Sequence, residues 1–201
     1  MNLLRNALFI TLSILNWIIP KDKRRIVIFG RKAINENNLA LLEHLIHNYN
    51  RYDIRVIIAK SIKLSKRYKA NNVKVITNPV FSVYNLLRSN WIFHTYGLYL
   101  TSMKPAHGQI IFNLWHGSPL KRIGLLDEKK PFTYNIKGDS YYLSASDFWT
   151  PINKKCWGYS YTQFFVGSNP RNDLLFKQNK DLDKLVCKRL IVLFMPTFRS
   201  S

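Results

Sequence analysis

The chain opens with an apolar run whose few polar positions repeat at helical spacing. Residues 3–19 are almost entirely apolar, and Pro20 with the basic stretch 21–25 closes the run. At 100° per residue, the polar positions fall within one arc of about 100°: Asn2, Arg5, Asn6, Ser13 and Asn16. This segregation is typical of a helix that lies in a membrane interface, followed by cations that meet anionic head groups. Residues 1–20 are therefore predicted to be an amphipathic, membrane-associating helix.

The membrane prediction assigns lipid contacts to six residues: Arg5, Trp17, Lys21, Lys23, Arg24 and Arg25. No cleavage site of the secretory type follows the apolar run. If the helix crossed the bilayer instead, the basic stretch behind it would place the body of the protein in the cytoplasm. We therefore expect a peripheral protein on the cytoplasmic face of the cell membrane. The alternative is that this helix packs on the protein's own core.

After residue 25, short β-branched runs alternate with longer stretches of helical periodicity. Continuous apolar strands between helices indicate a parallel sheet covered on both faces, so we predict a Rossmann-like α/β domain. The expected strands are 26–30, 54–59, 73–77, 91–96, 109–115, 141–145, 163–166 and 190–194. The expected helices are 37–49, 79–87, 147–157 and 181–188.

Charge and composition limit the partners. The 201 residues carry 31 Lys and Arg against 11 Asp and Glu, a net charge of +20, and 47% are hydrophobic. A composition of this kind folds, and its charge favours an anionic partner: nucleic acid, anionic lipid or a phosphorylated substrate. The segment 51–74 is strongly basic, which indicates either a solvated face or one turned to lipid. No helix-turn-helix, RRM or KH signature is present, so no nucleic-acid partner is expected.

The sequence gives little sign of a metal site, a cofactor or a disulfide. Cys156 and Cys187 are far apart and form no zinc set, which favours a reducing compartment. His44 and His47 have a spacing that could hold a metal, but no carboxylate or cysteine supports them. A surface pair of histidines is the simpler interpretation, and no metal or cofactor is expected.

The strongest candidate for chemistry is His116, which follows a predicted buried strand. In an open parallel sheet, functional groups gather at the carboxyl ends of strands. Gly117 permits a tight turn, and Ser118 followed by Pro119 reads as the start of a helix whose free N–H groups would face an anion, with Lys121 adding charge. A neutral imidazole beside such a cradle suits a general base. A purely structural histidine at a strand end is the alternative.

Two further loops follow predicted strands and should reach the same edge of the sheet. One lies in the region 141–149, and the other in the region 166–175, which contains Pro170, Arg171 and Asp173. Arg171 offers a planar fork for phosphate, and Asp173 can orient it. Taken alone, the second loop is equally compatible with an ordinary turn.

Four ordered motifs together resemble a known family. WHGSPLKRIG at 115–124, YLSASDFWTPI at 142–152, GSNPRNDLLF at 167–176 and MPTFRSS at 195–201 are similar to the signatures of the CDP-glycerol glycerophosphotransferases of teichoic-acid biosynthesis. The resemblance implies a GT-B fold, in which two Rossmann-like domains face a cleft. It also implies transfer of glycerol phosphate from CDP-glycerol to a lipid-linked acceptor, with release of CMP.

The resemblance also implies roles for single residues. His116 matches the histidine of the family's W-H-G motif, a catalytic base. Arg171 and Asp173 match a motif near the donor phosphates, and Arg199 matches the arginine of the P-T-F-R motif. With Gly117, Ser118 and Lys121, these residues form the expected donor-phosphate site.

The predicted division of the chain follows from the same comparison. Residues 21–189 are expected to form the N-terminal, acceptor-side half of the GT-B fold, and 190–201 the start of a second, nucleotide-binding domain. Such a half is expected to be inactive alone and to need a separate C-terminal half as partner. The alternative is a non-catalytic basic module that binds membranes, or a subunit of a split transferase.

Overall fold

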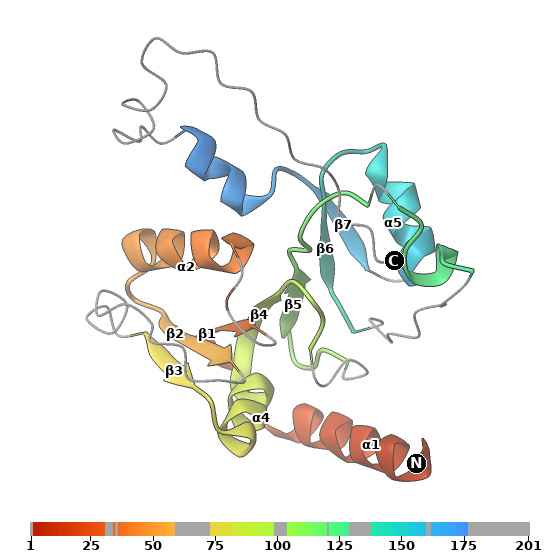
Figure 1. Ribbon diagram of the computed structural model, residues 1–201. Coiled ribbons are helices and arrows are strands. Elements are labelled where there is room, and N and C mark those ends of the chain that lie inside the picture. The colour runs from red at the N-terminus through yellow and green to blue at the C-terminus, as the bar shows by residue number, and fades with distance from the viewer. Residues whose placement is uncertain are drawn as a thin grey trace. The chain divides into compact units, whose positions relative to one another are not determined.

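Figure 1 shows the computed structural model, which describes residues 2–30, 34, 36–58, 73–98, 104–119, 121–128, 138–159 and 162–176. Contacts divide the chain into two units, residues 1–171 and residues 172–201. The elements are α1 (Asn2–Ile18), β1 (Asp22–Gly30), α2 (Glu36–Asn48), β2 (Asp53–Ile58), β3 (Lys74–Ile76), α4 (Pro79–Arg88), β4 (Ser89–His94), β5 (Ile110–Asn113), η1 (Gly124–Leu126), β6 (Tyr141–Ser144), α5 (Trp149–Trp157), β7 (Gln163–Val166) and η2 (Pro170–Phe176).

The strands form one sheet of seven in the order β3-β2-β1-β4-β5-β6-β7, and every neighbouring pair is parallel. The chain builds outward from β1 in one direction and then returns to β4 on its other side. Strand order therefore reverses between β1 and β4, where crevices form in open parallel sheets. The predicted Rossmann-like α/β fold is confirmed.

Apolar side chains from both faces of the sheet meet different helices. Along β1, Ile26 and Ile28 pack with the α2 residue Leu42, whereas Val27 and Phe29 pack with Leu86 of α4. Figure 1 shows α2 on one side of the sheet and α4 with α1 on the other. Continuous burial of residues 25–30 is thus the consequence of a sheet covered twice.

Local signals set the limits of α4. The side chain of Asn78 accepts hydrogen bonds from the N–H groups of Val80 and Phe81, and Pro79 occupies the first turn, where its missing N–H costs nothing. The helix begins where the sequence predicts and ends one residue later, at Arg88.

Helix α1 has the predicted amphipathic pattern but turns one of its polar residues inward. Asn16 is fully buried, and its Nδ2 donates to the carbonyl of Lys104 at 2.9 Å and to Oε1 of Gln109 at 3.0 Å. Leu12 is buried beside it in the core formed with α4. The large apolar residues that remain exposed include Leu8, Ile10, Ile14, Trp17 and Ile18. The alternative of packing on the core is therefore correct for one side of the helix, and the apolar side faces outward.

Several predictions fall outside the described residues. They include the helix 181–188, the strand 190–194, Arg199, the domain boundary at 189/190 and most of the basic segment 51–74.

Candidate functional site at the carboxyl edge of the sheet

His116 lies in the loop after β5, between two aromatic rings. Its imidazole stacks on Trp115 with 4.0 Å between centroids, and on Tyr96, from the loop after β4, with 4.6 Å. Because all strands are parallel, both loops reach the same edge of the sheet. The stacking restricts rotation of the imidazole and shields part of it from water.

An unusual backbone conformation presents this histidine. Trp115 has φ of 50°, a left-handed value that is uncommon for a large side chain. Asn113 at the end of β5 stabilises it, because its Oδ1 accepts a hydrogen bond from the Trp115 N–H at 2.9 Å. The turn is thus held by a side chain whose strand is fixed in the sheet.

Asn37 connects the His116 loop to the loop after β7. This residue lies in the first turn of α2 and is almost fully buried. Its Nδ2 donates to the carbonyl of Trp115 at 2.9 Å and to Oδ1 of Asn169 at 3.2 Å. Its Oδ1 accepts from the backbone N–H of Arg171 at 3.3 Å. One amide therefore fixes the relative positions of two loops that are more than 50 residues apart.

Arg171 reaches from its loop to the backbone beside His116. A Cβ placed on Gly117 would lie 3.4 Å from Nη2 of Arg171, an ordinary contact distance, so the guanidinium lies beside this residue. Gly117 has φ of 140°, and this backbone conformation favours glycine. The ion pair between the guanidinium and Glu36 is long, at 3.5 Å, and the Arg171 side chain is 36% exposed. Much of its hydrogen-bonding capacity remains open to an anion.

The surroundings keep His116 neutral. Burial lowers the pKa of His116 below its usual 6.5, and the positive charge of Arg171 lowers it further. A neutral imidazole next to a guanidinium can accept a proton from a hydroxyl while the guanidinium stabilises negative charge on a phosphate. This is the chemistry that phosphoryl transfer needs.

The remaining predicted residues occupy varied positions. Gly117 and Ser118 are half-buried in the His116 loop, Lys121 is exposed, and Asp173 is exposed in η2. The predicted helix start at Ser118 and Pro119 is wrong: these residues are irregular, and the next helical turn is η1. The reason is tertiary packing, because Ile123 and Leu126 pack against the buried cluster around Tyr142. The anion cradle therefore lacks the helix N-terminus that the sequence predicts.

Sequence reasoning missed Asn37 and Tyr96. Asn37 is the first residue of the predicted helix 37–49, and its hydrogen-bond partners lie 78 and 132 residues away. Tyr96 lies two residues beyond β4. Its position at a strand end was the one available signal.

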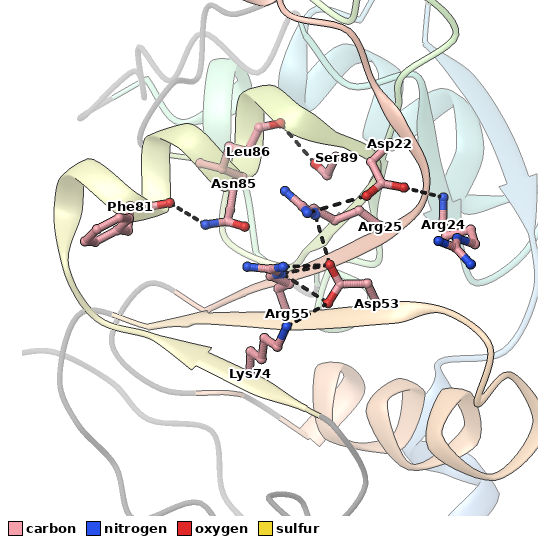
Figure 2. A network of polar contacts seen from close by, with 10 residues as sticks. All are labelled: Asp22, Arg24, Arg25, Asp53, Arg55, Lys74, Phe81, Asn85, Leu86 and Ser89. Atoms are coloured by element: carbon pink, nitrogen blue, oxygen red, sulfur yellow. Dashed lines mark hydrogen bonds and ion pairs between the residues drawn. The ribbon is translucent and has the colours of Figure 1, made fainter.

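A second polar cluster lies at the opposite, amino edge of the sheet (Figure 2). The carboxylate of Asp53 receives Nε of Arg25 at 3.1 Å and Nη2 of Arg55 at 2.7 Å, and Arg25 also reaches Asp22 at 3.4 Å. An open pocket of about 400 Å³ lies beside these residues and is lined by Arg24, Arg51 and Lys74 among others. We call this set the Asp53 cluster.

Metal ligands do not gather in the part of the chain that the structure describes, where no three His, Cys, Asp or Glu residues share a site. Cys156 is buried, and burial raises the pKa of its thiol, which keeps it protonated and a weak nucleophile. Among the described residues at this edge, His116 is a candidate proton acceptor and Arg171 a candidate anion ligand.

Comparison with known proteins identifies the family. Residues 11–201 match the family described as CDP-glycerol:poly(glycerophosphate) glycerophosphotransferase, to which the chain therefore belongs. No curated protein sequence matches the chain.

The fold is similar to that of solved structures of the wall teichoic acid polymerase TagF. One has a TM-score of 0.64 at 17% identity and covers 88% of this chain and 45% of its own. A TagF variant with a histidine replaced by asparagine and soaked with CDPG has a TM-score of 0.65 at 16% identity, covering 89% and 46%. The chain thus spans less than half the length of these polymerases.

Proposed function

We propose that the chain transfers glycerol phosphate from CDP-glycerol to a hydroxyl of a lipid-linked teichoic-acid acceptor, or of a similar cell-surface polymer, and releases CMP. Family membership supports the reaction class. The observation that carries the proposal is His116, held between Tyr96 and Trp115 with a lowered pKa beside Arg171.

In the proposed step, an acceptor hydroxyl oxygen attacks the β-phosphorus of CDP-glycerol. A new oxygen–phosphorus bond forms while the bond to the bridging oxygen breaks, and CMP leaves with that oxygen. His116 accepts the hydroxyl proton, and Arg171 stabilises charge on the phosphoryl oxygens. Lys121, Asp173 and Arg199 are further proposed contributors to the donor-phosphate site, with Gly117 and Ser118 allowing close approach.

We infer that residues 1–201 form the acceptor-side half of a GT-B enzyme. The extent of the match to TagF supports this, since less than half of each polymerase is covered. The chemistry needs donor and acceptor to meet within hydrogen-bonding reach of His116. We therefore expect turnover to require a nucleotide-binding half, and residues 1–201 alone to release CMP too slowly to detect. The alternative is a membrane-binding module or subunit without catalysis of its own.

The test uses residues 1–201 joined to, or mixed with, the nucleotide-binding half of a family member, called the completed enzyme below. Replacing His116 by alanine should lower kcat about 10²–10⁴-fold, the range for a lost general base. His107→Ala is the matched control, because His107 lies near α1 rather than at the carboxyl edge and should leave kcat unchanged. A fully active His116→Ala enzyme would remove this residue from the mechanism.

We further propose that α1 docks the protein on the cytoplasmic face of the cell membrane. None of the described helices is long and apolar enough to cross a bilayer. The supporting observation is the outward apolar side of α1, where Trp17 is 67% and Ile18 63% exposed while Asn16 holds the helix to the body. Val80 and Phe81 of α4, a helix that contacts α1, are also exposed.

The basic residues after α1 contribute unequally to this proposal. Lys23 and Arg24 are exposed and can meet anionic head groups. Lys21 donates to the carbonyls of Asn16 and Leu87, and burial lowers its pKa to about 8. Arg25 is buried against Asp22 and Asp53. We therefore propose that Lys23 and Arg24 contribute more to lipid binding than Lys21 and Arg25 do. The Arg5 side chain lies outside the described set.

Flotation with vesicles containing anionic phospholipid tests the docking. Ile14→Ser combined with Ile18→Ser changes the outward side of α1 without touching Leu12 or Asn16, and should abolish flotation. Phe148→Ser is the control, because Phe148 is equally exposed but lies next to α5. Removing residues 1–20 should also release the protein, and high salt should weaken binding of the intact chain. Equal flotation of the double variant and the intact chain would contradict the proposal.

A further inference from the structure

A buried carboxylate lies beneath the carboxyl edge of the sheet. Asp139, 8% exposed, precedes β6 and accepts three side-chain hydrogen bonds. Nε2 of His94 donates to its Oδ1 at 2.8 Å. The hydroxyl of Tyr159 and Nδ2 of Asn113 donate to its Oδ2 at 2.6 Å and 3.0 Å. Residues from three other segments of the chain thus converge on one buried carboxyl group.

The hydrogen bonds fix how each partner is oriented. Nδ1 of His94 accepts the backbone N–H of Gly97 at 3.0 Å, so the ring proton lies on Nε2 and points to Asp139. Asn113 directs its Nδ2 to Asp139, which leaves its Oδ1 to accept the N–H of Trp115. Neither partner can rotate without breaking a bond to buried groups.

His94 and Asn113 each also hydrogen-bond to the backbone beside one of the two aromatic rings that stack on His116. The bond between His94 and Gly97 closes the turn that contains Tyr96. The hydrogen bond between Asn113 and Trp115 stabilises the left-handed backbone conformation of Trp115, which supplies the second ring. His94 and Asn113 are themselves register partners on adjacent strands. The Asp139 side chain hydrogen-bonds to both His94 and Asn113, and so adds a side-chain link to the backbone pairing of β4 and β5.

We propose that Asp139 is a positioning residue that holds Tyr96 and Trp115 on the two faces of the His116 imidazole. Its effect on catalysis rests on the proposed function, whereas its effect on the geometry of His116 does not. An apolar side chain or an amide cannot replace it. The first leaves three buried donors unpaired, and the second places a donor against another donor.

The first measurement is the NMR spectrum of the His116 ring protons in residues 1–201, assigned with His116→Gln. Protons above two aromatic faces resonate upfield, so Asp139→Asn should move them downfield toward the values of an exposed histidine. Tyr159→Phe removes a single donor and should give a smaller shift in the same direction. If Asp139→Asn does not fold, Tyr159→Phe still tests the positioning role. Gln109→Leu is the control, because Gln109 is equally buried but hydrogen-bonded at the amino edge, to the carbonyls of Leu86 and Ser89.

The second measurement is kinetic and uses the completed enzyme. Displacing a catalytic group by about 1 Å costs roughly 10²-fold, so Asp139→Asn should lower kcat by about that factor with KM little changed. Tyr159→Phe should lower it roughly three- to tenfold. Unchanged His116 resonances in folded Tyr159→Phe, or in folded Asp139→Asn, would overturn the positioning role. Shifted resonances together with a fully active His116→Ala enzyme would instead overturn the proposed function and leave the positioning role standing.

Discussion

Each of the two edges of the sheet carries a cluster of charged and polar residues. The two clusters differ in how their charged side chains are paired. At the amino edge, the Asp53 cluster joins residues two or three apart in sequence or on adjacent strands (Figure 2). At the carboxyl edge, Asn37 comes from α2, His116 from the loop after β5 and Arg171 from the segment after β7. The first cluster pairs its buried cations with carboxylates, whereas the second brings an imidazole and a guanidinium together.

The effect of each cluster on pKa values shows the same contrast. Burial alone would raise the pKa of Asp53, but the hydrogen bond from Arg55 and the charges of Arg55, Arg25 and Lys74 outweigh it and lower that pKa. Opposite charges thus stabilise one another. Burial and a like charge lower the pKa of His116, so the folded structure opposes protonation of a group it holds in place. An arrangement that disfavours charge on a fixed histidine is typical of a functional site.

Replacing one arginine at each edge by glutamine is expected to give the largest difference, which appears in kcat and in the thermal unfolding midpoint. Arg171→Gln should lower kcat of the completed enzyme about 10²–10³-fold, because charge on the phosphoryl group loses a preorganised donor. Its thermal unfolding midpoint should not change, since its ion pair with Glu36 is weak and exposed. Arg55→Gln should lower the midpoint and leave kcat unchanged. An equal loss of kcat in both variants would contradict the claim that the carboxyl edge serves catalysis and the amino edge serves stability.

Removing the carboxylate at the amino edge should affect stability rather than activity. Asp53→Asn leaves Arg25 without its main partner and should cost about 2 kcal/mol at pH 7. Because the pKa of Asp53 is lower in the folded state, its contribution is complete above the unfolded value, about 3.9, and is lost as pH falls through the folded value. Urea unfolding of both proteins should therefore give free energies that converge at low pH. A difference of the same size at pH 7 and pH 3 would contradict the ion-pair explanation.

The smallest expected effect is on the titration of His116. Arg171→Gln removes a like charge, so the pKa of His116 should rise toward its usual value, which NMR titration of residues 1–201 can measure. The folded pKa of His116 lies below the unfolded one, so its protonation favours the unfolded chain as pH falls below about 6.5. The variant should show less of this acid destabilisation. An unchanged titration would mean that burial alone sets the pKa.

Local patterns were sufficient to predict the parallel sheet, although the strands expected at 91–96 and 109–115 end two residues earlier, at His94 and Asn113. The apolar run Ile26–Gly30 gave a buried strand, Asn78 with Pro79 gave the start of α4, and His116 was located from its place after a strand. These features depend on periodicity, capping and the rule that parallel strands end at one edge.

Long-range partnerships were not predictable from the same patterns. Nothing near Asn37 signals a bond to Trp115, because that contact depends on how α2 lies against the sheet. Asn16 was placed on the polar side of α1, but Gln109 and Lys104 supply partners that favour burying it. At Ser118 and Pro119 the capping signal was outweighed by the packing of Ile123. In each case tertiary contacts decided the outcome.

The central claim is that His116 acts as a neutral base at the carboxyl edge, and the pH dependence of kcat/KM in the completed enzyme tests it most directly. The wild-type profile should fall on the acidic side, with an apparent pKa below 6.5, because the protonated imidazole cannot accept a proton. The residual activity of His116→Ala should lack this acidic limb, while that of Arg171→Gln should keep it at a higher pH. The same acidic limb in His116→Ala and wild type would show that another group is the base.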